Sequence, residues 1–365
     1  MNKHIFSFIM LLAFPVYSLE VVFIDPTIDN SPFWQQVRHV ATAAAKNLDI
    51  DLKIYSSGGH RLWQKQAINK VISQKNKPDY LIFLPYDGTV ADSFTKLEQA
   101  EIPFITLERP IFSEVQNALG KPRGKFKFWL GEIYHDNEKA GQLLAKALFE
   151  ASTHYATPTN NNLNVIGISG GFSGQTNQRN AGLLAELEQH NSDFSLAQIV
   201  NAHWQRKLAA EKFDKLLIRY NDILIVWAAS DIMALGVADS AKKNGKIINK
   251  NLFIGGFDWA TEALQAIKDD TYTASVGGHF MQVAWALVKI YDHANGKPAF
   301  TINGNTPSYE LQLIDRNNID DYLALLNTPD WNTVDFRQFA LSHQDNLTGY
   351  QFNFAKVVDK LKEQN

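Results

Sequence analysis

The chain has 365 residues, and at roughly 150 residues per domain this length predicts two domains. Hydrophobic residues make up 45% and charged residues 20%, a balance that excludes a disordered or fibrous chain. The net charge of -3 excludes the basic footprint of a nucleic-acid-binding protein, and the absence of cysteine excludes disulfides, thiolate metal sites and cysteine nucleophiles.

The N-terminus predicts an export signal. Lys3 precedes an apolar run from Ile5 to Val16, and the small Ser18 marks a cleavage point. An anchoring helix is the alternative, but this run is shorter than the roughly 20 apolar residues that span a bilayer. We therefore expect a cleaved signal peptide over residues 1–18 and a mature chain in the periplasm.

Strands and helices alternate along the rest of the chain. In the first half we expect strands at Glu20–Ile24, Asp51–Tyr55, Tyr80–Pro85 and Pro103–Glu108, and helices at Phe33–Leu48, Trp63–Gln74 and Thr89–Ala100. In the second half we expect helices at Asn137–Ser152, Asn177–His190, Gln205–Tyr220 and Asp231–Asn244, and strands at Asn164–Gly170, Ala197–Ala202, Ile223–Ala229 and Phe253–Asp258. Strands that are apolar throughout indicate parallel sheets covered by helices. The predicted fold class is α/β, with two doubly wound parallel-sheet lobes.

Ligands of such sheets bind beyond the carboxyl ends of the strands. The residues found there are Asn30, Phe33 and Trp34, then Tyr86 and Asp87, then Glu108 and Arg109, and in the second half Arg179, Trp204, Ser230, Asp231, Phe257, Asp258 and His279. Aromatic faces pack on the C–H surface of a sugar ring, and guanidinium and carboxylate groups hold its hydroxyls. This mixture predicts a polyol site.

Each candidate also has a structural alternative. Arg109 could form an ion pair with a neighbouring helix, Phe33 and Trp34 could staple the first helix to the core, Asp231 and Asp258 could cap helices, Trp204 could be a core residue, and Tyr86 with Asp87 could form a turn.

Five segments, taken in chain order, resemble the type I periplasmic binding proteins. These are the ribose- and galactose-binding proteins related to the ligand-binding half of LacI-type repressors. The segments are NSPFW (Asn30–Trp34), IPFITLERP (Ile102–Pro110), GQTNQRNAGL (Gly174–Leu183), ASDIMALGV (Ala229–Val237) and GGFDWATEALQAI (Gly255–Ile267). The resemblance covers most of the mature chain.

The resemblance implies two lobes that close on a ligand around three crossovers, near Gly131–His135, Gly277–Gly278 and Pro307–Leu311. The implied N-terminal lobe is 19–133 plus 279–308, the C-terminal lobe 134–278 plus 309–330, and a C-terminal extension 331–365. The implied ligand contacts are Asn30, Phe33, Trp34, Glu108 and Arg109 from the first lobe and Arg179, Trp204, Ser230, Phe257 and Asp258 from the second, with Asp231 matching as well. At the position of Gly278 the family carries a polar ligand residue. His279 is expected either to fill the gap that Gly278 leaves or to act only in the hinge.

The departures from the family pattern disfavour ribose. Glu108 stands where pentose binders carry aspartate, Ser230 where they carry asparagine, and Gly278 where they carry a polar ligand residue. The receptor for autoinducer-2, which signals through a membrane sensor kinase, is a second branch for comparison because Ser31 and Trp34 match it. An arginine of that branch corresponds to Gly278 here.

An enzyme would need an acid and base pair, for which Glu108 and Asp258 are the candidates. Arg109 beside Glu108 argues against this, because a guanidinium lowers the pKa of a neighbouring carboxyl. No hydrolase elbow, zinc-protease motif, phosphate loop or calcium loop is found in the sequence. We therefore expect no enzyme, no cofactor and no metal.

The expected function is capture of a sugar or polyol for a membrane ABC permease. The alternative is a sensory component that presents its bound state to a membrane sensor kinase. The last helix, with Phe354, Val357, Val358 and Leu361 on one face, is expected either to pack on a lobe or to dock a partner.

Overall fold

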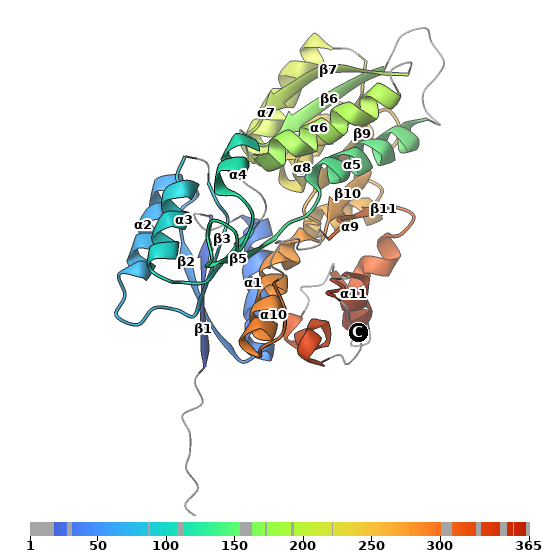
Figure 1. Cartoon of the computed structure of the whole chain (residues 1–365). Coiled ribbons are helices and arrows are strands. Elements are labelled where there is room, and N and C mark those ends of the chain that lie inside the picture. The colour runs from blue at the N-terminus through green and yellow to red at the C-terminus, as the bar shows by residue number, and fades with distance from the viewer. Residues whose placement is uncertain are drawn as a thin grey trace, which may run out of the picture.

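The computed structural model describes residues 18–27, 31–86, 88–107, 113–153, 163–171, 174–190, 193–220, 222–300, 309–325, 330–343, 349–352 and 354–362. The expected signal peptide therefore lies almost wholly outside the described residues. Within those ranges, no helix combines the length and the apolar character needed to cross a membrane. Figure 1 shows two lobes, each built around one sheet.

The first sheet has five parallel strands in the order β2-β1-β3-β4-β5. Its strands are β1 (Leu19–Asp25), β2 (Ile50–Ser56), β3 (Tyr80–Phe83), β4 (Phe104–Leu107) and β5 (Trp129–Ile133), and the helices between them are α1 (Pro32–Asn47), α2 (Arg61–Ile72), α3 (Val90–Gln99) and α4 (Ser113–Leu119). Side chains alternate between the faces of each strand. Val22 and Ile24 of β1 join the core cluster that includes residues of α2 and α3, whereas Val21 and Phe23 join the one that includes α1.

The second sheet has six strands in the order β11-β10-β9-β8-β6-β7, and β11 alone runs antiparallel to its neighbour. Its strands are β6 (Leu163–Ser169), β7 (Phe194–Asn201), β8 (Ile223–Ala228), β9 (Phe253–Phe257), β10 (Ala274–Gly277) and β11 (Gln312–Asp315), and its helices are α5 (Asn137–Ser152), α6 (Gly174–Gln189), α7 (Arg206–Arg219), α8 (Asp231–Lys243) and α9 (Thr261–Lys268). The central strands β8, β9 and β10 are buried at every position.

The chain passes between the lobes three times. It leaves β5 for α5, leaves β10 through a short 3-10 helix (His279–Met281) for α10 (Gln282–Ala294), and returns from α10 to β11. Helix α10 packs on α1, β3, β4 and β5, so it belongs to the first lobe although the second sheet precedes it in the chain. These passages bring the carboxyl ends of both sheets toward one junction.

The predicted α/β class with two lobes is confirmed, and the ends of the predicted elements lie within three residues of the observed ones. The elements that sequence reasoning missed are α4, β5, α9, β10, α10 and β11. Nearly all residues of helix α10 are buried, including the polar Gln282, Lys289 and Asp292, which a sequence pattern would place on an exposed face. The strands β10 and β11 are only four residues long, too short for a clear alternation.

The C-terminal extension crosses between the lobes. Its helical turns are η3 (Trp331–Thr333), η4 (Phe336–Phe339) and η5 (Leu341–His343), followed by α11 (Phe354–Lys362), and the turn η2 (Ile319–Leu325) precedes the extension in the second lobe. Turn η2 packs on α9 of the second lobe, η3 and η4 pack on α1 and α10 of the first, and α11 returns to η2. The four apolar side chains expected on one face of α11 are all buried, so this helix packs on the protein. Figure 1 shows the extension in red beside α10.

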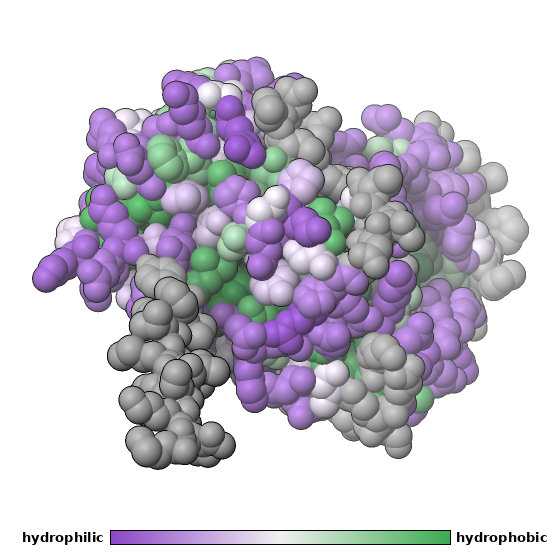
Figure 2. All heavy atoms as spheres, turned by 60° about the horizontal axis from the view of Figure 1, so that its bottom comes forward, coloured by the Kyte–Doolittle hydropathy of each residue, from purple (hydrophilic) through white to green (hydrophobic). Residues whose placement is uncertain are grey.

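The surface turned forward in Figure 2 is mainly hydrophilic, with hydrophobic side chains set between polar ones. A mixed surface of this kind is usual for a protein that faces water, because polar atoms alone cannot cover a globular domain.

Candidate functional site

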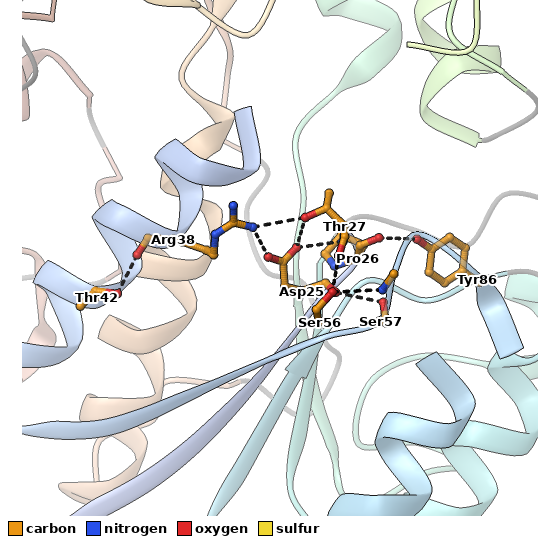
Figure 3. A network of polar contacts seen from close by, with 9 residues as sticks. Asp25, Pro26, Thr27, Arg38, Thr42, Ser56, Ser57 and Tyr86 are labelled. Carbon is orange, nitrogen blue, oxygen red and sulfur yellow. Dashed lines mark hydrogen bonds and ion pairs between the residues drawn. The ribbon is translucent and has the colours of Figure 1, made fainter. Parts of the chain in front are cut away.

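A polar network fixes the end of β1 against α1 (Figure 3). The buried Asp25 carboxylate accepts hydrogen bonds from the backbone N–H and the hydroxyl of Thr27, at 3.0 and 2.8 Å, and forms an ion pair with Arg38 of α1. Arg38 also donates to Thr27 Oγ1 at 3.2 Å, and the Tyr86 hydroxyl donates to the Pro26 carbonyl at 3.4 Å. Sequence reasoning missed this network, which anchors the helix whose first turn carries the predicted aromatic pair.

Phe33 and Trp34 lie in the first turn of α1 and are half-buried. Trp34 stacks on Phe23 of β1 with 6.4 Å between ring centroids, and its ring meets the edge of Phe33 at 5.2 Å. The ring of Phe33 lies 4.5 Å from that of His279, which stands at the second crossover between the lobes. Trp34 thus packs on its own lobe, as the stapling alternative expected, and Phe33 contacts the residues of the junction.

Arg179 is buried on α6 and its guanidinium is held by groups of the second lobe. Nε donates to the Asn137 side-chain oxygen at 2.9 Å, and Nη1 donates to the Ala229 carbonyl at 2.8 Å. The guanidinium carbon lies 4.4 Å from the centroid of the Phe257 ring, at cation–π distance. Phe257 is fully buried, so its ring supports Arg179, and its expected contact with a ligand stays a prediction.

His279 and Asp258 complete a polar cluster around Arg179. His279 Nε2 lies 3.3 Å from Arg179 Nη2 and 3.2 Å from Asp258 Oδ1. Burial raises the pKa of Asp258 to about 7, although the neighbouring guanidinium acts in the opposite direction. Burial, followed by the charge of Arg179, lowers the pKa of His279 well below its ordinary value, so the imidazole is neutral at pH 7. Asp258 also has a φ of 107°, which is rare for a residue other than glycine and typical of functional positions.

His135 and Asn137 belong to the same cluster and were not predicted. His135 Nε2 hydrogen-bonds the Asn137 side-chain oxygen at 3.0 Å, and its ring lies 5.0 Å from that of His279. Burial lowers the pKa of His135 well below its ordinary value, and the nearby His279 and Arg179 act in the same direction.

The contact between Asn137 and Arg179 depends on a very close approach of α5 and α6. A side-chain carbon at Gly141 of α5 would lie 2.1 Å from the Arg179 carbonyl oxygen, and one at Gly182 of α6 would lie 2.0 Å from the Glu138 carbonyl oxygen. Glycine at these two positions therefore lets the helices approach until the start of α5 meets Arg179. Two glycines within helices were the only signal that the sequence offered.

Ser230 and Asp231 lie together at the start of α8 but have different roles. Asp231 is fully buried and accepts hydrogen bonds from the Ala260 backbone N–H, the Tyr272 hydroxyl and the Ser275 hydroxyl. It caps the start of α9, so the expected ligand contact of Asp231 is corrected to a structural role. Ser230 is 2% exposed, and its hydroxyl oxygen has no hydrogen-bond partner among the described residues.

Trp204 follows β7 with a φ of 60° and is 41% exposed. Its indole packs so closely on Gly170 that a side-chain carbon there would lie 2.1 Å from the ring. Trp204 is therefore no core residue, and its part in ligand binding stays a prediction. Asn30, Glu108 and Arg109 lie outside the described residues, as does Asp87.

The described residues contain no group of three or more histidine, aspartate or glutamate side chains placed to hold a metal ion. What they bring together is Phe33 from the first lobe with Arg179, Asp258 and His279 from the second lobe and the second crossover. Donors, acceptors and one aromatic ring therefore meet where the lobes join.

Comparisons with known proteins show which family and which relatives this chain resembles. Residues 21–298 match the family model for the periplasmic binding protein domain. The ribose import binding protein RbsB of Salmonella typhimurium is 23% identical over 265 residues, which cover 72% of this chain and 80% of that protein. The HTH-type transcriptional regulator MalR of Clostridium butyricum is 27% identical over 171 residues, so the match spans about half of that relative, 47% of its length and 47% of this chain.

A solved structure extends the likeness to nearly the whole chain. The crystal structure of a periplasmic sugar-binding protein from Pseudomonas fluorescens has a TM-score of 0.81 at 25% sequence identity. The superposition covers 94% of this chain and 99% of that chain.

Proposed function

The chain belongs to the periplasmic binding protein family, as the resemblance predicted, and from this premise we propose that it captures a sugar or sugar-like polyol in the periplasm and delivers it to a membrane ABC transporter. A ribose import protein and a periplasmic sugar-binding protein among its relatives support this ligand class. The proposal is one of binding without catalysis, cofactor or metal.

The observation that carries the proposal is the buried cluster of Arg179, Asp258 and His279 beside the Phe33 ring. A guanidinium donates in a planar fork, a carboxylate accepts, and a neutral imidazole does one of each. Neighbouring hydroxyls of a sugar match this set because each hydroxyl both donates and accepts. The ring of Phe33 offers an apolar surface to the C–H face of the same ligand.

Two buried polar atoms support the presence of a ligand. The Ser230 hydroxyl oxygen and His279 Nδ1 lack partners within the described part of the chain. A buried polar atom without a hydrogen bond is uncommon in proteins and costs about 1–3 kcal/mol. Ligand hydroxyls at these positions would remove that cost on binding.

The charges of the cluster favour a neutral ligand. Above pH 7, where Asp258 is ionised, its charge and that of Arg179 sum to zero, and burial keeps His279 uncharged. A carboxylate or ammonium group of a ligand would add an unbalanced charge at a buried site, which is costly. Neutral sugars and cyclic polyols fit these described residues better than sugar acids or amino sugars.

Binding would then couple the lobes. A ligand held by Arg179 and Asp258 of the second lobe and packed on Phe33 of the first contacts both lobes only when they are closed together. Such a ligand stabilises the closed conformation by its differential affinity for it. This is how capture would be signalled to a membrane transporter.

A thermal-shift panel tests the ligand class. Pentoses, hexoses and cyclic polyols are compared with sugar acids and amino sugars, and a ligand at 1,000 times its dissociation constant should add about 4 kcal/mol of stability. Arg179→Ala should abolish the shift, whereas the matched control Arg219→Ala, on the exposed end of α7, should leave it unchanged. If only charged compounds shift the transition, or none does, the proposal is wrong.

Delivery and location need a cellular assay. A strain without this protein should lose uptake of the labelled ligand, and the wild-type gene but not the Arg179→Ala gene should restore uptake. N-terminal sequencing of the protein from the periplasmic fraction should begin near Leu19. Normal uptake in the deletion strain would contradict a role in transport while leaving ligand binding intact.

A further inference from the structure

We propose that His279 is the residue that selects the ligand, through the hydrogen-bonding character of its Nδ1 atom. The inference rests on the proposed function and assigns one specificity-determining group within that site. It also predicts how this group changes with pH.

The His279 ring is fixed by its neighbours. Its Nε2 atom faces Arg179 and Asp258 at 3.3 and 3.2 Å. The rings of Phe33 and His135 pack against it with centroids at 4.5 and 5.0 Å, and the residue is 2% exposed. A half-turn of the ring would remove Nε2 from Arg179 and Asp258, so these two polar contacts hold Nδ1 in one direction. Nδ1 is buried and has no partner in the described ranges.

Nε2 can serve only one of its two neighbours at a time. In a neutral imidazole one nitrogen donates and the other accepts. Arg179 only donates, whereas an ionised Asp258 only accepts. When Nε2 carries the proton it donates to Asp258, and Nδ1 is an acceptor. When Nε2 carries no proton it accepts a hydrogen bond from Arg179 or from a protonated Asp258, and Nδ1–H is a donor.

The protonation of Asp258 decides between these two tautomers. Burial raises its pKa to about 7, so both forms occur near neutral pH. His279 stays neutral in both because burial and Arg179 lower its own pKa. His135, the remaining titratable group whose ring packs on His279 in the described chain, stays neutral because burial, His279 and Arg179 lower its pKa.

Two more titratable groups respond to the charge of Asp258: Asp231 at the start of α8 and Tyr272 between α9 and β10. Asp231 is fully buried, and burial, with the charge of Asp258 as the next cause, raises its pKa well above the ordinary value. Burial and the charge of Asp231 likewise raise the pKa of Tyr272, which donates to Asp231 at 2.9 Å. Tyr309 contacts His135 at 3.5 Å from the third crossover. None of these groups supplies a cation that would replace Arg179.

The ligand class follows from the two states of Nδ1. A hydroxyl satisfies Nδ1 in both states because it donates and accepts. A methyl ether only accepts, so it fits below pH 7, where Nδ1–H is a donor. An ammonium only donates, so it fits above pH 7, where Nδ1 is an acceptor. His279 therefore selects a ligand hydroxyl at this position over an ether above pH 7 and over an ammonium below pH 7, and only the hydroxyl fits on both sides of pH 7.

Two substitutions test the two ring nitrogens of His279 separately. The amide of glutamine takes the place of Nε2, and the amide of asparagine takes the place of Nδ1. We expect His279→Gln to keep the melting temperature of the ligand-free protein and to lower affinity for the best sugar of the panel about 10- to 100-fold by calorimetry. His279→Asn should retain more affinity and lose melting temperature. Wild-type affinity in His279→Gln would overturn the assignment.

A measurement without ligand separates this inference from the proposed function. Nitrogen-15 NMR of the imidazoles in the full-length protein should show one tautomer of His279 at pH 6 and the other at pH 8, and Asp258→Asn should abolish the change. The resonance is assigned by its loss in His279→Gln. An unchanged tautomer between pH 6 and pH 8 refutes the inference even if a sugar binds. Failure of every neutral polyol refutes the proposed function even if the tautomer switches.

Discussion

Replacing Asp258 by asparagine should stabilise the ligand-free protein at neutral and alkaline pH. The Asp258 side chain is 16% exposed, and burial raises the pKa of its carboxyl to about 7 from an ordinary value of 3.8. The folded protein therefore binds this proton more tightly than the unfolded chain does. Stability is lost as the pH rises from about 4 to about 7, and the loss is complete above pH 7. Asparagine cannot ionise and avoids the loss.

The size of the effect follows from the same two pKa values. Above pH 7 the ionised carboxylate costs about 4 kcal/mol, since one pKa unit corresponds to about 1.4 kcal/mol. At pH 5 most of that cost has not yet appeared. The free energy of unfolding of Asp258→Asn, relative to the wild type, should therefore increase by about 3 kcal/mol between pH 5 and pH 8.

Urea unfolding of both proteins at pH 5, 6, 7 and 8, without ligand, measures this difference. The buried histidines act in the opposite direction, because a lowered pKa costs stability as the pH falls below about 6.5. They are present in both proteins, so the difference between the proteins isolates Asp258. A difference that is equal at pH 5 and pH 8 would show that Asp258 ionises normally and would refute the reasoning.

Three further predictions concern other parts of the site and its frame. Arg179→Lys should cost roughly 2 to 5 kcal/mol of ligand affinity by calorimetry, because an ammonium lacks the planar fork whose separate nitrogens bond Asn137 and Ala229; unchanged binding would make Arg179 structural. Trp34→Ala should lower the free energy of unfolding by roughly 1–3 kcal/mol without ligand, whereas Phe33→Ala should mainly weaken binding. If the two variants changed stability and affinity equally, the assignment of Trp34 to packing and Phe33 to binding would be wrong. Asp292→Ala leaves the backbone N–H groups of residues 341 and 342 without their acceptor, so limited proteolysis should cut the extension sooner than in the wild type, and equal rates would argue against this anchor.

Strand order explains why much of the site could be predicted from the sequence. Ser230, Asp258 and His279 follow β8, β9 and β10, which are neighbours in the sheet. Parallel neighbours end at the same edge, so candidates read from separate strand ends meet in space. Arg179 reaches the same edge because it lies in the second turn of α6, the helix that follows β6.

Long-range packing explains what the sequence concealed. Asp231 was read as a residue of its own helix, but its carboxylate caps α9, 29 positions later. Such a contact depends on how two helices lie on the sheet, which no local pattern encodes. Asn137 likewise reads as the first residue of a helix, and only the close packing at Gly141 and Gly182 brings it to Arg179.

The structure therefore supports a different role for Arg179 in the proposed mechanism from the one that the sequence predicted. From the sequence we expected Arg109 and Arg179 to hold hydroxyls from opposite lobes, so that closure would be favoured only when a ligand links them. In the structure the guanidinium is already oriented by Asn137, by the Ala229 carbonyl and by the Phe257 ring, all within the second lobe. A group that is ordered before binding does not lose side-chain entropy when the ligand arrives. In the proposed function the second lobe is thus the preformed half of the site, and the first lobe, through Phe33 of the anchored helix α1, would be the half that closes on it.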